Sequence, residues 1–216
     1  MTSTYVHHRI TTEPLQWQAV AEALSQTGAQ RLEAAGGALY GIWRSQIGRP
    51  RDELTVMTLW PDPGHAANAA EILLQGVEAI RDCHNQPMQP TVRPQTPEPP
   101  RRQGNYAFRW FDTPAPNWQE FLDLCVAAWP GFESAYDSQV IGLWEFVGSD
   151  DAMRRTLLLT RRPNLAMWER SKIPEGEAEA EVRRKLSRRY DLCDSTYVYT
   201  TTLLTADDQR DEVRWA

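Results

Sequence analysis

Two stretches of the chain share one pattern of apolar and polar positions. In the first, apolar runs at 38–43 and 54–60 flank a polar break that contains Gly, Pro and Asp. Val, Ile, Thr, Tyr and Trp favour strands, and the polar break suits a turn, so this stretch is a predicted β-hairpin. The stretch 138–160 repeats the design, and its IGLW at Ile141–Trp144 echoes YGIW at Tyr40–Trp43. We interpret the echo as an internal repeat.

The segments around the first hairpin complete a recognisable order of elements. Apolar residues recur with helical spacing at 15–35 and again from 62 to 80, and short β-leaning runs lie at 5–11 and 88–93. The first half therefore reads β-α-β-β-α-β, which is the ferredoxin-like order.

The second half restarts after a stretch rich in proline and charge. It is expected to hold a strand at 105–111, a helix from Trp118 to Trp129 that stops at Pro130, the second hairpin, helices at 165–171 and 177–191, and a last strand at 197–204. The predicted segments are a first ferredoxin-like repeat at 1–95, a linker at 96–104, a second repeat at 105–206 and a charged tail at 207–216.

The strands of both hairpins are apolar on both faces, although a ferredoxin-like sheet carries helices on one face only. Two such sheets packed face to face would cover each other. The fold class we predict is α+β, with two tandem ferredoxin-like units packed sheet to sheet as an intrachain dimeric α/β barrel. One chain then supplies an intrachain pseudo-dimer, and any further homodimer would use helix faces or strand edges.

The charge, the cysteines and the apolar runs of the sequence argue against several classes of function. The formal charge of −6 argues against a nucleic-acid partner, and we interpret the basic runs at 154–155, 161–162 and 183–189 as solvated faces. The three Cys have no spacing typical of disulfide frameworks or metal sites. No apolar run approaches the length of a membrane helix and no leader peptide is visible, so we expect a cytoplasmic protein with no membrane partner.

The densest polar cluster on a predicted strand is His7, His8 and Arg9. Successive strand residues alternate faces, so His7 and Arg9 point together. An enclosed imidazole beside a guanidinium stays neutral and can accept a proton from an acidic substrate. The alternative is a surface His and an Arg9 that pairs with a core carboxylate.

Two segments resemble the NIPSNAP proteins. QIGRPRDELTVMTLWPD, in the first hairpin, looks like that family's hairpin, and YAFRWFDTP at Tyr106–Pro114 is similar to its opening strand, whose Arg maps to Arg109. The family often carries His two positions before the Trp of the third strand, where this chain has Thr58. More broadly the chain resembles a tandem member of the dimeric α/β-barrel superfamily, whose members include cofactor-free monooxygenases, small isomerases and lyases, and haem enzymes.

The resemblance implies that His7, Arg9 and Arg109 face the barrel interior, where we expect them to be catalytic. Ligand-binding residues are expected on the same faces, opposite the helix-packing residues Ile42, Met57, Leu59, Leu143, Leu157 and Leu159; they are Trp43, Thr58, Trp60 and Trp144. The alternative for the Trp residues is plain core packing.

The leading hypothesis is a small-molecule enzyme without a bound organic cofactor or metal. It would act on an apolar or aromatic acidic compound between the two sheets, in a monooxygenase-, isomerase- or lyase-like reaction. The alternatives are a non-catalytic ligand-binding or scaffold protein of the NIPSNAP type and, third, a haem-binding protein with one of the four His as axial ligand.

Overall fold

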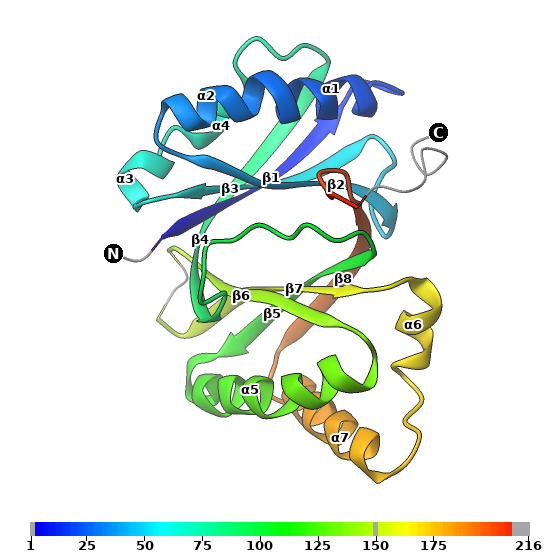
Figure 1. Cartoon of the computed structure of the whole chain (residues 1–216). Helices are drawn as coiled ribbons and strands as arrows, with labels where there is room; N and C mark the ends of the chain where they lie inside the picture. Colours follow the sequence, from blue (N-terminus) through cyan, green and yellow to red (C-terminus); the bar gives the residue numbers. More distant parts are fainter. Residues whose placement is uncertain (1–2, 149–150, 209–216) are drawn as a thin grey trace. The chain divides into compact units, whose positions relative to one another are not determined.

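The computed structural model describes residues 3–148 and 151–208 (Figure 1). The chain divides into two compact units. Unit 1 comprises the residues up to Pro90, Thr96–Gln103 and those from Thr201 onward, and unit 2 comprises Thr91–Gln95 and Gly104–Thr200. We describe each unit by itself.

Unit 1 follows a β-α-β-β-α-β order of elements. They are β1 (Thr4–Thr12), α1 (Trp17–Ala23), the π-helical turn η1 (Leu24–Gly28), α2 (Ala29–Ala34), β2 (Ala38–Ile47), β3 (Glu53–Trp60), α3 (Pro63–Ala66), α4 (Ala69–Leu74) and β4 (Ile80–Arg93). The sheet order is β4-β1-β3-β2-β8, in which β1 pairs antiparallel with both β3 and β4. Its core joins the helices to one sheet face through residues such as Val6, Ile10, Leu24, Leu32 and Val56.

Unit 2 repeats this order of elements. They are β5 (Asn105–Pro114), η2 (Ala115–Asn117), α5 (Trp118–Ala135), β6 (Gln139–Phe146), β7 (Met153–Arg162), α6 (Leu165–Arg170), α7 (Glu177–Asp191) and β8 (Ser195–Leu203). The sheet order is β8-β5-β7-β6-β4, and α5 packs beside α7 (Figure 1). The core between helices and sheet includes Phe111, Phe121, Cys125, Leu143 and Leu158.

Two strands belong to both units. The last residues of β4, from Thr91, lie in unit 2, and the last residues of β8, from Thr201, lie in unit 1. Each five-stranded sheet is therefore completed by a strand that begins in the other unit.

The shared YGIW and IGLW motifs have a structural reason. In both hairpins the strand register shifts just before a glycine, between Leu39 and Gly41 and between Val140 and Gly142. A Cβ atom added to Gly41 would lie only 2.5 Å from the ring of Trp43, and the matching distance from Gly142 to Trp144 is 2.4 Å. The glycine therefore leaves the space that the indole two residues later occupies.

Two predicted element ends were wrong. The helical region from residue 62 ends at Leu74, because Gly76 and Ala79 adopt positive φ and the chain then enters β4, where Cys83 and His84 pair with β1. In unit 2, α5 does not stop at Pro130 but runs on to Ala135. Pro130 is exposed, so water can satisfy the carbonyl that loses its helical hydrogen bond.

Among the described residues, none of the helices is long and apolar enough to cross a membrane.

Candidate functional site

On the unit 1 sheet, three of the expected site residues share one face. His7 lies opposite Met57 and Trp43 opposite Thr55 in the strand register, and both side chains are buried on the face turned away from the helices of unit 1. Arg9 follows His7 on this face by strand alternation. The structure thus places His7, Arg9 and Trp43 on one face of the unit 1 sheet, and their expected catalytic and ligand-binding roles stay predictions.

Thr58 and Trp60 lie on the opposite, helix-packed face, so their expected place beside His7 was wrong. Trp60 belongs to the core under the helices, and its Nε1 donates a hydrogen bond to Thr58 Oγ1 at 2.9 Å. The same hydroxyl lies 3.0 Å from His8 Nε2, and His8 Nδ1 lies 2.6 Å from Asn85 Oδ1. These hydrogen bonds satisfy the buried His8 ring and the buried Thr58 hydroxyl, which indicates a structural role.

Arg9 has a protein carboxylate as partner. Its Nε lies 3.5 Å from Glu53 Oε2, and Glu53 Oε1 lies 3.5 Å from Arg49 Nε. The Glu53 side chain is buried, and burial raises the pKa of its carboxyl although the two arginines lower it. The alternative in which Arg9 pairs with a core carboxylate is therefore the correct one, and no unpaired guanidinium remains there to hold an acidic substrate.

In unit 2, Trp144 and Arg109 lie on different faces of the sheet. Trp144 pairs in register with Leu157 on the face away from the helices, as expected for Trp144. Arg109 pairs with Leu158, a core residue under the helices, so its expected place on the inner face was wrong. The helix-packing roles expected of Met57, Leu157 and Leu159 were wrong for the same reason, whereas those of Ile42 and Leu143 are confirmed.

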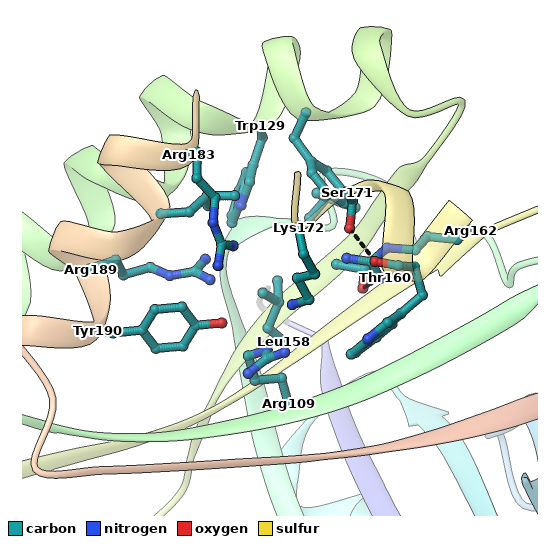
Figure 2. Close-up of a pocket in the computed structure, with 14 residues that line it drawn as sticks. Arg109, Trp129, Leu158, Thr160, Arg162, Ser171, Lys172, Arg183, Arg189 and Tyr190 are labelled. Carbon is teal, nitrogen blue, oxygen red and sulfur yellow. Dashed lines mark hydrogen bonds between the residues drawn. The ribbon is translucent and has the colours of Figure 1, made fainter. Parts of the chain in front are cut away.

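Arg109 lines a pocket between the unit 2 sheet and helices α5, α6 and α7. Cationic side chains gather there from β5, β7, the end of α6 and α7, and Figure 2 shows several of their charged ends turned toward one space. They are Arg109, Arg162, Lys172, Arg183 and Arg189. We call these five residues the cationic cluster.

The cationic cluster has no counter-charge within the described part of the chain. None of its members lies within 4.0 Å of a carboxylate there, and no Asp or Glu lines the pocket. Two members are almost fully buried, Arg162 at 6% and Arg189 at 3% exposure, and the Nε of each lacks a hydrogen-bond partner. Buried charges without partners are costly, so the arrangement favours an anion in the pocket.

Burial and mutual repulsion shift the protonation of the cluster. The pKa of Arg162 falls to about 10, first because of burial and then because of the charge of Arg109. The pKa of Lys172 falls to about 8, chiefly through burial and then through the surrounding guanidinium groups. At pH 7 Arg162 therefore stays charged, while about a tenth of Lys172 is free amine.

Aromatic rings form the other part of the lining. The Arg162 guanidinium lies 4.4 Å from the ring centre of Trp168, the Lys172 ammonium 5.0 Å from the same ring, and the Arg109 guanidinium 5.4 Å from the ring of Tyr190. These cation–π contacts partly offset the missing counter-charges. Cations and aromatic rings thus line the same pocket.

Most of these residues were missed in the sequence because Arg162 and the run 183–189 were interpreted as solvated. Two signals were present. Arg162 continues the alternation of Leu158 and Thr160 on the helix-packed face of β7, and Arg183, Leu186 and Arg189 recur with helical spacing.

A second pocket, in unit 1, is a poorer candidate. It lies along α1 between Trp17, Ile42 and Leu204, and Glu22 is its single charged lining residue. It offers no group that would select or activate a ligand.

A metal or a histidine-ligated haem does not fit the unit 2 pocket. In the described ranges no group of three or more His, Cys, Asp or Glu is placed to hold a metal ion. All four His belong to unit 1, and none lines the pocket. The chain therefore offers no imidazole there as an axial ligand for iron.

No protein-family model matches the sequence, and no curated protein matches it. Solved structures do resemble it. One is a proposed monooxygenase from Lactobacillus acidophilus NCFM, with 12% identity over 95% of this chain and 98% of that chain and a TM-score of 0.60. Another is an anthrone oxidase-like protein, with 14% identity over 94% and 92% and a TM-score of 0.53. A mutant chlorite dismutase from Candidatus Nitrospira defluvii gives 8% identity over 94% and 92% and a TM-score of 0.59.

At these identities the likeness concerns the fold alone. It extends over nearly the whole of each chain, and the element order of both units agrees with it. The chain therefore has an α+β fold that resembles the fold of these solved structures.

Proposed function

We propose that unit 2 binds a small molecule in which a carboxylate or phosphate group adjoins an aromatic or conjugated body. We further propose that the protein is a small-molecule enzyme acting on that compound without a bound organic cofactor. The observation that carries the proposal is the cationic cluster, five cations around one pocket without a carboxylate partner among the described residues. The site we propose for the acidic ligand therefore lies under the helices of unit 2 and not on the face that holds His7.

Three features support recognition of an acid. Guanidinium groups bind carboxylate and phosphate with paired hydrogen bonds, and the unpartnered Nε of Arg162 and of Arg189 are free to take part. An anion would also relieve the repulsion that lowers the pKa of Arg162 and Lys172. The rings of Trp168 and Tyr190 suit a flat body.

The enzymatic part of the proposal rests on analogy. Structures with the same fold include a proposed monooxygenase and an anthrone oxidase-like protein, and fold alone does not fix a reaction. The resemblance to NIPSNAP proteins and the descent of the two halves from one repeat belong to the same proposal. Their sequence basis is the hairpin and the YGIW and IGLW motifs.

A fluorescence titration with benzoate tests the binding, because Trp129 and Trp168 line the pocket and report on a ligand. Benzamide, a neutral molecule of the same shape, is the matched ligand control, and ionic strength is held constant because salt screens charge. We expect benzoate to quench the fluorescence in a saturable way, inorganic phosphate to compete with it, and benzamide to bind much more weakly.

Variants separate the pocket from the general charge of α7. R183Q removes a cation of the pocket, and R184Q removes its neighbour, which is exposed and already paired with Glu177 and Glu181. We expect R183Q to weaken benzoate binding about tenfold, the usual effect of losing one hydrogen bond to a charged group, and R184Q to leave it unchanged. Equal effects of the two variants, or equal affinity for benzoate and benzamide, would contradict the proposal.

A further inference from the structure

Lys172 differs chemically from the other members of the cationic cluster. The sequence uses Arg at almost every basic position and has only two lysines, Lys172 and Lys185. An arginine holds its proton at any physiological pH and is a poor nucleophile, whereas a lysine amine that loses its proton can attack a carbonyl carbon. A pocket that needed only positive charge would gain nothing from a lysine at this position.

The surroundings of Lys172 resemble those that activate an amine. Its side chain is half-buried at the end of α6, the ammonium lies 5.0 Å from the ring centre of Trp168, and no carboxylate lies within 4.0 Å of it within the described residues. Guanidinium groups from β5, β7 and α7 line the same pocket (Figure 2). Burial and neighbouring positive charge both favour the free amine, which is how lysines that form imines are activated.

We propose that Lys172 is the nucleophile of this pocket and forms an imine with the aldehyde or ketone group of an acid held by the surrounding arginines. The inference rests on the proposed function, since the arginines must first bind the acidic group. It narrows the substrate class to oxo acids with an aromatic or conjugated body.

The step balances without a co-reactant. The amine nitrogen of Lys172 forms a bond to the carbonyl carbon, and a proton moves from nitrogen to the carbonyl oxygen to give a carbinolamine. Loss of this hydroxyl as water leaves a carbon–nitrogen double bond. When the imine is protonated it withdraws electrons from the adjacent C–H or C–C bond, and that bond is then the one to react.

Reductive trapping of the full-length protein with 4-formylbenzoate tests the inference. This probe combines a carboxylate, a ring and an aldehyde, and sodium cyanoborohydride adds hydride to the imine carbon and fixes the adduct as a secondary amine. Lys185 is an internal control, because it is also half-buried but lies outside the pocket on α7 and pairs with Glu181 at 3.5 Å. Digestion and mass spectrometry then report the labelling of each lysine separately.

We expect Lys172 to be labelled at least about tenfold faster than Lys185 at pH 7.5, because the arginines of the pocket hold the probe's carboxylate beside Lys172 and burial lowers the pKa of its amine to about 8. The rate should rise with pH up to about 8, the pKa of Lys172, and then level off. Benzoate should block the labelling, and neutral benzaldehyde should label the two lysines more evenly. K172R should lose the adduct.

The outcomes separate this inference from the proposed function. If benzoate binds but the two lysines are labelled equally, or benzoate does not protect Lys172, the imine inference is wrong and the anion pocket stands. If benzoate does not bind to the wild-type protein, the proposed function itself is wrong. Preferential, benzoate-sensitive labelling of Lys172 supports both.

Discussion

At the scale of single residues, the two units differ in whether their buried polar and charged side chains have partners. In unit 1 the guanidinium of Arg9 meets Glu53, and His8 is satisfied by Thr58 and Asn85. In unit 2, Arg162 donates to Thr160 and Arg189 to Cys125, but no member of the cationic cluster has a carboxylate partner among the described residues. Polar groups that satisfy one another indicate a structural role, whereas unpartnered charges indicate a ligand.

Arg109 is therefore expected to cost stability in the absence of a ligand. R109M keeps a similar length of side chain but removes a charge that burial and nearby arginines disfavour. We expect it to raise the free energy of unfolding by about 1 kcal/mol in urea denaturation without added anion, and to abolish the stabilisation that benzoate gives the wild-type protein. A decrease of about 2 kcal/mol or more in the free energy of unfolding is typical of removing the partner of a buried polar group. That result would show that Arg109 has a structural role.

The buried histidines of unit 1 make a separate prediction about pH. Burial lowers the pKa of His7 to about 3 and that of His8 to about 4, from an ordinary value of 6.5. The unfolded chain then binds more protons than the folded one below pH 6.5. The stability that the neutral rings contribute is thus fully present above pH 6.5 and is lost as the pH falls toward 4.

Urea denaturation between pH 6.5 and 5 measures this loss, which approaches about 1.4 kcal/mol per pH unit for each histidine. H8Q should reduce the dependence of the free energy of unfolding on pH by the contribution of one histidine. H65Q is the matched control, because His65 is exposed on α3 and pairs locally with Asp62. A slope that H8Q leaves unchanged would show that His8 is not protonated on unfolding in this range.

At the scale of elements, the sequence predicted the order and type of the strands and helices well. The helices at 165–171 and 177–191 were found nearly to the residue, because turn residues such as Asn164 and Gly176 precede them. Both hairpins were also found, although β2 runs on to Ile47, beyond the apolar run at 38–43. The start of β4 was missed because its first residues extend the helical spacing of the segment before it.

Which strand face meets the helices was harder to predict. Alternation shows that Val56, Thr58 and Trp60 share a face, but Met57 and Leu59 make the other face apolar as well. With both faces apolar, the pattern does not say which one the helices cover. This is why Thr58, Trp60 and Arg109 were assigned to the wrong face, and why the cationic cluster was not recognised.

The glycine of the IGLW motif allows the second hairpin to pack, and its substitution tests this packing. In G142A the added Cβ would lie 2.4 Å from the Trp144 ring and 2.8 Å from Pro94 Cδ. We expect a loss of about 1–3 kcal/mol in the free energy of unfolding, the usual cost of overpacking a core. G64A is the control, since its nearest contact is the exposed Asp62 side chain at 3.2 Å. Equal stability of the two variants would mean that the Trp144 ring can move aside.

At the scale of the whole molecule, the chain does not divide where its sequence restarts. Unit 1 needs the last residues of β8, where Leu203 is fully buried and the Leu204 amide donates to the Ile42 carbonyl at 2.7 Å. The predicted boundary at residues 96–104 therefore separates the repeats of the sequence but not the two compact units.

Truncation after Thr200 tests this dependence. It leaves unit 2 with all of its residues and removes the part of β8 that completes unit 1. We expect a loss of at least about 2–5 kcal/mol, the cost of removing a buried Leu side chain, and faster amide exchange in β2 than in β6. Unchanged exchange in β2 would show that unit 1 is complete without these residues.

The central claim is that the pocket of unit 2, and not the His7 face of unit 1, receives an acidic aromatic ligand. Crystals grown with 4-iodobenzoate test it most directly, because the anomalous signal of iodine locates the ring. The account predicts an iodine peak in the pocket beside Trp168, with the carboxylate on Arg109 and Arg189. An occupied iodine site beside His7 and Trp43, with the unit 2 pocket free of ligand, would contradict it.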